Sequence, residues 1–296
     1  MCYETILEKE KRSFAELTSN LKLIGKTFNT DGYDKAIRRA VLDLTARTLT
    51  PKASVTTKLA NVLTDVSDAN SFISKITEYF NGQPMSQETF DDWHHARCCE
   101  VLAKIQDHYT NSDGSDVHYG KAQKIVNITL KGCYCLDRAD QREGYFEHCH
   151  MPLDSFTLAW YNRNNNRGSK IETSWSNLEY DNEYIGIVTG IRNMRDPIFA
   201  DLTPLQKEFL IWPLEIMITT VKGVNDCFGG IIEGNHVDRY FDEYGLSHDL
   251  AMARIILGLD TPTDLDDDFV NWLKSISAKY KKSISADFLL QKYEKI

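Results

Sequence analysis

The chain has 296 residues, 42% of them hydrophobic and 26% charged, with a net charge of -9. This ordinary globular balance excludes wholesale disorder. The acidic charge argues against a protein that coats nucleic acid by bulk electrostatics, although a local basic surface remains compatible with it. No apolar run approaches the roughly 18 residues that cross a bilayer, and the first residues lack a signal-peptide pattern. We therefore expect a cytoplasmic protein.

Helical spacing of apolar residues runs through most of the chain. It predicts helices over residues 4–28 and about 36–44, and a long helix with Ser86 as its N-cap. Residues 111–116 have the composition of a loop. A further helix is expected from Gly120 to about Cys135. A short helix capped by Asp154 follows Pro152, and another begins at residues 203–204.

The fold class is therefore mainly α. Residues 264–296 are expected to be helical, and residues 218–223 are the best candidate for a strand. We expect an N-terminal helical region over residues 1–112, a central region over 113–200, and a C-terminal helical region over 201–296. The C-terminal region is expected to pack with the N-terminal one.

The cysteines and histidines show no metal-site spacing. The seven cysteines form no even framework, so we expect free thiols: Cys2, Cys98, Cys99, Cys133, Cys135, Cys149 and Cys227. His94 and Cys98 lie four residues apart, but nothing nearby completes a set of ligands. The acidic run at 264–268 fits a charged helix start. We expect neither a metal nor a cofactor.

Two segments carry the residues of greatest chemical interest. In residues 119–131, Lys124, Asn127 and Lys131 lie along one stripe of the predicted helix, and Gly120 at its start would let backbone N–H groups approach a phosphate. Alone, the stripe is most simply a solvated face. In residues 150–163, Asp154 precedes an apolar run, and alone it is most simply an N-cap.

Together the two segments resemble the helix-hairpin-helix DNA glycosylases. In endonuclease III and its relatives, a glycine turn leads into a helix with a catalytic lysine, followed by an Asn-containing apolar stretch; here residues 124–130 read KIVNITL. The family then places a Val-Asp at the start of the next helix, which runs on to an Asn-Arg pair. Here these positions are Leu153-Asp154 and Asn162-Arg163. The 30-residue spacing and the Pro-Leu-Asp triplet are closer to the archaeal 8-oxoguanine glycosylase branch. The two segments also resemble a phage-defence glycosylase that acts on glucosylated hydroxymethylcytosine.

The resemblance covers about 45 residues, and the chain departs from it in two places. The usual Leu-Pro-Gly-Val-Gly hairpin is replaced by residues 116–120, and the C-terminal four-cysteine cluster is absent because only Cys227 lies beyond Cys149. We therefore predict no iron–sulfur cluster.

The resemblance implies a two-lobed helical fold and a DNA glycosylase with possible lyase activity at the abasic site. Lys124 would attack the sugar C1′. Asp154 would stabilise the positive charge that develops on the sugar and would help to deprotonate Lys124. The partner would be double-stranded DNA with a modified base, bound by a monomer. Residues expected to contact DNA are Gly120, Lys121, Lys131, Arg163 and Arg167. Candidates for the pocket of the flipped base are Trp93, His94, Trp160, Trp175 and Trp212.

The sequence leaves several alternatives open. The substrate is 8-oxoguanine-like, a damaged pyrimidine or a hypermodified phage cytosine, and the role is repair or phage defence. The main alternative function is a non-enzymatic helical regulatory or partner-binding module, which would explain the acidic balance. In a glycosylase, Lys124 and Asp154 must converge in a cleft between two helical lobes, under a basic rim; in such a module they would point to unrelated surfaces.

Overall fold

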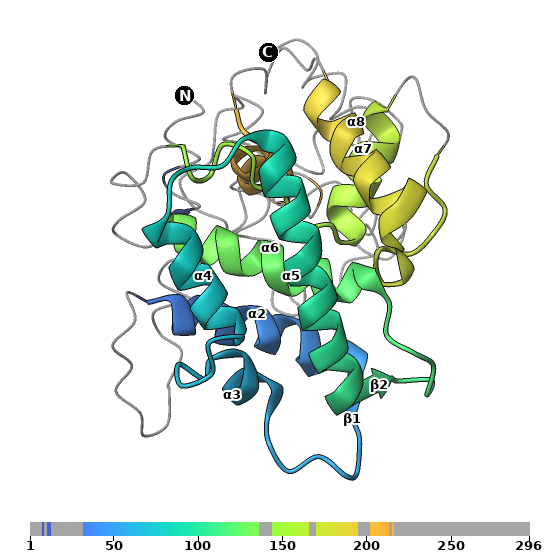
Figure 1. Cartoon of the computed structure of the whole chain (residues 1–296). Helices are drawn as coiled ribbons and strands as arrows, with labels where there is room; N and C mark the ends of the chain where they lie inside the picture. Colours follow the sequence, from blue (N-terminus) through green and yellow to red (C-terminus); the bar gives the residue numbers. More distant parts are fainter. Residues whose placement is uncertain are drawn as a thin grey trace, which may run out of the picture. The chain divides into compact units, whose positions relative to one another are not determined.

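The computed structural model of the chain describes residues 8, 11, 12, 32–135, 144–165, 170–194, 202–212 and 215. The described part is mainly helical, which confirms the predicted fold class at this level (Figure 1). Its labelled elements in chain order are α2 (Tyr33–Thr48), β1 (Leu49–Pro51), α3 (Leu59–Leu63), α4 (Phe72–Asn81), α5 (Gln87–His108), β2 (Tyr109–Asn111), α6 (Tyr119–Cys135), α7 (Ser155–Asn164), η2 (Trp175–Asn177), η3 (Tyr180–Tyr184) and α8 (Ile185–Asn193). Residues 204–212 are also helical.

The contacts divide the chain into two compact units, Leu7–Phe209 and a second unit of Met1–Ile6 with Leu210–Ile296. The elements from α2 to α8 all lie in the first unit. Of the second unit, only residues 210–212 and 215 are described. The predicted helix at 4–28, apart from helical residues 8, 11 and 12, lies outside the described residues, and so do the predicted strand at 218–223 and the predicted helical tail. The predicted regions and their packing stay predictions.

Helix α6 is the centre of the first unit. It packs against α2 and against the long helix α5 (Figure 1). Every residue of α6 is buried except Lys124 and Tyr134. A helix buried on all its faces has to satisfy its polar side chains inside the protein. Lys124 therefore marks one of two places where this helix reaches partly exposed surroundings.

The helix starts follow the predicted capping residues. Ser86 accepts a hydrogen bond from the Thr89 N–H and caps α5. Thr203 and Gln206 form a reciprocal pair at the start of the helix at 204–212, since each side-chain oxygen accepts the other's backbone N–H. Asp154 caps α7. These local signals confirm the predicted starts of all three helices.

A short sheet joins the ends of α2 and α5. Strands β1 and β2 pair antiparallel, with Leu49 opposite Asn111 and Pro51 opposite Tyr109. Three-residue strands are too short to show an alternating pattern, which is why the sequence did not predict them. Among the described residues, no helix combines the length and apolar character needed to cross a membrane.

Candidate functional site

The structure brings Lys124 and Asp154 together. Lys124 lies on the second turn of α6, and Asp154 stands immediately before α7. The Lys124 Nζ is 3.6 Å from the Asp154 Oδ2, with side-chain exposures of 17% and 12%. Both groups are mostly buried, yet neither is sealed from solvent. This 3.6 Å distance is that of an ion pair, longer than the roughly 2.6 to 3.2 Å of a direct proton transfer, and the two groups can act together on one bound molecule.

The two carboxylate oxygens of Asp154 have different partners. Oδ1 accepts the backbone N–H groups of Phe156 and Thr157 at 3.0 and 3.1 Å, which satisfies the first turn of α7. The Thr157 hydroxyl accepts the Asp154 N–H at 2.7 Å and completes a capping box. Because Oδ1 is fixed by the helix, Oδ2 is held toward Lys124. Asp154 is thus both an N-cap and half of an ion pair.

An aromatic ring lies against the same lysine. The Lys124 Nζ is 4.5 Å from the centre of the Trp175 ring, in η2. The backbone of Trp175 packs onto the first turn of α6 at Gly120, where a Cβ would stand 1.9 Å from the Trp175 carbonyl oxygen. Gly120 also donates its N–H to the Leu178 carbonyl at 2.9 Å. Gly120 therefore permits the close approach that places Trp175 beside Lys124.

Other charged groups lie near the pair. Asp43 on α2 forms an ion pair with Arg39 at 3.0 Å. Burial raises the pKa of Asp43, and the positive charges of Arg39 and Lys124 oppose that shift. Glu208 forms an ion pair with Lys131, with Nζ and Oε2 2.5 Å apart. Burial raises the pKa of the Glu208 carboxyl, and Lys131 opposes this.

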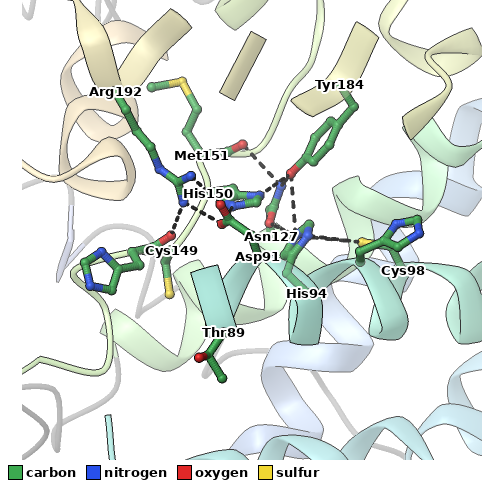
Figure 2. A network of polar contacts seen from close by, with 12 residues as sticks. Thr89, Asp91, His94, Cys98, Asn127, Cys149, His150, Met151, Tyr184 and Arg192 are labelled. Atoms are coloured by element: carbon green, nitrogen blue, oxygen red, sulfur yellow. Dashed lines mark hydrogen bonds and ion pairs between the residues drawn. The ribbon is translucent and has the colours of Figure 1, made fainter. Parts of the chain in front are cut away.

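A buried polar network joins α5, α6, α8 and the segment that leads to Asp154 (Figure 2). At its outer end, Arg192 binds both oxygens of Asp91 at 2.7 Å each. His150 connects Asp91 to the Tyr184 hydroxyl at 2.8 Å on each side. Hydrogen bonds from Arg192 and His150 hold the pKa of Asp91 well below its usual range, against the effect of burial.

The inner end of this network reaches α6. The Asn127 Oδ1 is 2.7 Å from the His94 Nε2, and the Asn127 Nδ2 donates to the Tyr184 hydroxyl at 3.0 Å (Figure 2). Burial lowers the pKa of both His94 and His150, so both rings are neutral in the folded protein at pH 7. The network is a set of satisfied core contacts that fixes α5, α6 and residues 149–151 to one another.

The residues predicted to contact DNA mostly point inward. The backbone at Gly120 is covered by Trp175 and Leu178. Lys121 is buried and donates to the Thr48 carbonyl at 2.8 Å. Lys131 is buried against Glu208 and the Phe209 ring. Arg163 is half-buried at the end of α7, and Arg167 lies outside the described residues. Gly120, Lys121 and Lys131 are therefore covered by other parts of the chain.

One of the five predicted pocket residues has its ring against the Lys124 Nζ. This residue is Trp175. Trp93 stacks on Tyr79 with ring centres 4.7 Å apart. His94 belongs to the core network, and Trp160 is buried at 2% exposure. Trp212 is partly exposed and belongs to the second unit.

Most of the described thiols lie in the core. The described cysteines Cys98, Cys99, Cys133, Cys135 and Cys149 are all free, and all but Cys99 are buried. Cys98 contacts the His94 ring at 3.7 Å inside the network. In the described part of the chain, no three His, Cys, Asp or Glu side chains gather into a group that could hold a metal.

Several neighbours of the site could not be predicted from the sequence. Asp43 and Glu208 come from distant helices, so no spacing along the chain links them to Lys124. Gln123 precedes Lys124 directly, but its position in the sequence gives no indication of what it binds. The chain matches no known family model, no curated protein and no solved structure. The geometry of this site is therefore the basis for assigning a function.

Proposed function

We propose that the protein is a DNA glycosylase that excises a modified base, with Lys124 as nucleophile and Asp154 as the carboxylate that assists it. We further propose that the chain has the two-lobed helical fold of the helix-hairpin-helix DNA glycosylases. The observation that carries the proposal is the 3.6 Å contact between Lys124 and Asp154, since the resemblance to the glycosylases requires these two side chains to converge. A binding module has no need to bring these two residues into contact.

The geometry suits cleavage of an N-glycosidic bond. As the bond between C1′ and the base lengthens, positive charge develops on the sugar, and a fixed carboxylate stabilises that charge. Asp154 is suited to this role because the N–H groups of α7 bind Oδ1 and leave Oδ2 directed into the site. The helix N-terminus also favours the ionised carboxylate.

Lys124 would supply the covalent step. The unprotonated Nζ attacks C1′ as the base departs with the electron pair of the broken bond, and the ionised Asp154 then takes up the proton that the attacking nitrogen releases. The departing base takes up a proton from solvent. Ring opening then gives a Schiff base, from which strand cleavage at the abasic site can follow. The side chain of Trp175, 4.5 Å from the same Nζ, is placed to contact the sugar or the flipped base.

Borohydride trapping tests the proposal because it reduces the Schiff base to a stable amine. The protein is incubated with duplexes that contain 8-oxoguanine, thymine glycol, uracil or glucosylated hydroxymethylcytosine, and adducts are resolved on denaturing gels. We expect an adduct with one of these duplexes and none for Lys124→Gln. Lys104→Gln, which replaces an exposed lysine on α5, is the matched control and should form the adduct normally.

Two other outcomes would change the assignment. An adduct that persists in Lys124→Gln would transfer the nucleophile to another amine. If no duplex gave either an adduct or an abasic site, the glycosylase proposal would fail for these bases, and the helical partner-binding module would become the better account of an acidic chain.

A further inference from the structure

The backbone segment that precedes α7 and ends at Asp154 is held by side chains of α6. Residues 150–154 lie between a turn and α7 and belong to no sheet, yet His150, Met151, Leu153 and Asp154 are all buried. Buried backbone N–H and C=O groups need hydrogen-bond partners. For Leu153 and Met151 those partners are two side-chain amides of α6, Gln123 and Asn127.

The Gln123 side-chain amide makes two hydrogen bonds with the Leu153 backbone, one as donor and one as acceptor. Its Nε2 donates to the Leu153 carbonyl at 2.8 Å, and its Oε1 accepts the Leu153 N–H at 3.2 Å. The same Nε2 donates to the Gly120 carbonyl, and the same Oε1 accepts from the Asn127 amide. Both N–H groups and both lone pairs of the Gln123 amide are therefore in use.

Asn127 extends this support by one helical turn. Its Nδ2 donates to the Met151 carbonyl at 3.2 Å. Residues four apart on a helix are separated by about 6 Å along its axis, and alternate residues of an extended chain by about 6.6 Å. The two amides of α6 therefore match the spacing of residues 151 and 153, as the edge of a neighbouring strand would.

The orientation of residues 151–153 relative to α6 places Asp154 beside Lys124. Gln123 binds Leu153 and Asn127 binds Met151, so the segment runs antiparallel to α6. Lys124 follows Gln123 in the sequence, and Asp154 follows Leu153. Gln123 and Leu153, which are hydrogen-bonded to each other, are thus the immediate neighbours of the two residues that form the ion pair.

We propose that Gln123 is a positioning residue for the reaction, which clamps the Leu153 backbone and thereby sets the place of the Asp154 carboxylate at Lys124. This proposal rests on the proposed function. A buried amide is costly to desolvate unless all its hydrogen bonds are made, and a leucine or methionine would fill a helix core without that cost. The polar residue at position 123 is accounted for by the backbone that it holds.

The first part of the test measures the clamp without any substrate. Amide hydrogen exchange at Leu153 is compared in the wild-type protein, in Gln123→Met and in Gln106→Met. Gln106 is the matched control because it is a glutamine of α5 whose amide also donates to a backbone carbonyl, that of Val117, at 2.8 Å. We expect exchange at Leu153 to accelerate about tenfold in Gln123→Met and to stay within twofold in Gln106→Met. Equal exchange in all three proteins would refute the clamp.

The second part measures whether the clamp acts through Asp154. Single-turnover excision rates are measured for the wild type, Gln123→Met, Asp154→Asn and the double variant. We expect Gln123→Met to slow excision by at least tenfold in the wild-type background and by less than twofold when Asp154 is already Asn. A merely structural role would give the same loss in both backgrounds, and that result would overturn the proposal.

The two parts separate failure of the clamp from failure of the proposed function. An accelerated Leu153 exchange together with equal rate losses in both backgrounds would leave the glycosylase intact and remove Gln123 from its mechanism. A protected Leu153 amide in a wild-type protein that excises no base would refute the proposed function, and the positioning role would fall with it.

Discussion

Replacement of Asp154 by asparagine and by alanine separates the two roles of its carboxylate. Asparagine is among the best N-cap residues, so Asp154→Asn retains an oxygen that can accept the Phe156 and Thr157 N–H groups. It removes the negative charge that faces Lys124. Asp154→Ala removes both the charge and the cap. The two variants should therefore differ in stability while they resemble each other in activity.

The magnitudes follow from the geometry. Loss of the cap in Asp154→Ala should cost about 1 kcal/mol of unfolding free energy more than Asp154→Asn does. At 3.6 Å, two full charges attract each other by roughly 4 to 5 kcal/mol at an effective dielectric constant of about 20. Desolvation and partial charge on the sugar reduce this for the transition state. Loss of about 3 kcal/mol of stabilisation corresponds to a roughly hundredfold slower excision in both variants.

Urea denaturation and single-turnover excision measure the two quantities separately. We expect Asp154→Asn to be less stable than the wild type, because the mostly buried Lys124 loses its ion partner, and to lose excision about a hundredfold; Asp154→Ala should be equally slow and about 1 kcal/mol less stable again. If Asp154→Asn excised the base at the wild-type rate, the carboxylate would have only its capping role, and the proposed mechanism would be refuted.

Two further predictions concern the surroundings of the site. Gly120→Ala places a Cβ 1.9 Å from the Trp175 carbonyl oxygen. It should therefore destabilise the fold by roughly 1 to 3 kcal/mol and slow excision by displacing Trp175. A thermal melt equal to that of the wild type would contradict this contact. Burial lowers the pKa of His94 and His150, so the unfolded chain binds more protons than the folded one below about pH 6.5. The unfolding free energy should therefore fall between pH 6.5 and 5 by up to about 1.4 kcal/mol per pH unit for each histidine. His94→Gln should reduce that slope in urea titrations, and a stability independent of pH in this interval would argue against buried neutral rings.

Local signals in the sequence predicted much of the described fold. Ser86, Asp154 and Thr203 begin helices because a side-chain oxygen can satisfy the first N–H groups wherever an apolar run follows. Helix α6 was expected within one residue of its observed start, Tyr119. These features depend on residues within a few positions of one another, and they are therefore visible in a single sequence.

The inward orientation of the polar residues of α6 could not be predicted in this way. Lys124, Asn127 and Lys131 follow the spacing of a solvated face, but only Lys124 is partly exposed. Asn127 is buried against His94, and Lys131 against Glu208. Such partners come from other helices, so spacing within α6 gives no indication of them. The pairing of Lys124 with Asp154 was expected only because two segments together resembled a known arrangement.

The structure also gives Gly120 a different role from the predicted one, because the group that approaches it comes from a distant part of the chain. A glycine at the start of a helix suits a phosphate that approaches the backbone, and it equally suits another part of the chain. In the structure the backbone of Trp175 occupies that position. The sequence indicated that something approaches closely at Gly120, but the identity of the approaching group is a tertiary contact.

The central claim is that the Nζ of Lys124 bonds to the sugar of the substrate, and peptide mapping of the trapped adduct tests it most directly. Trypsin cleaves after Lys121, Lys124 and Lys131 in the unmodified chain. A lysine that carries the reduced sugar resists cleavage, so the account predicts one peptide spanning residues 122–131, with the sugar-derived mass on Lys124. The same mass on a peptide that does not contain Lys124 would contradict the account.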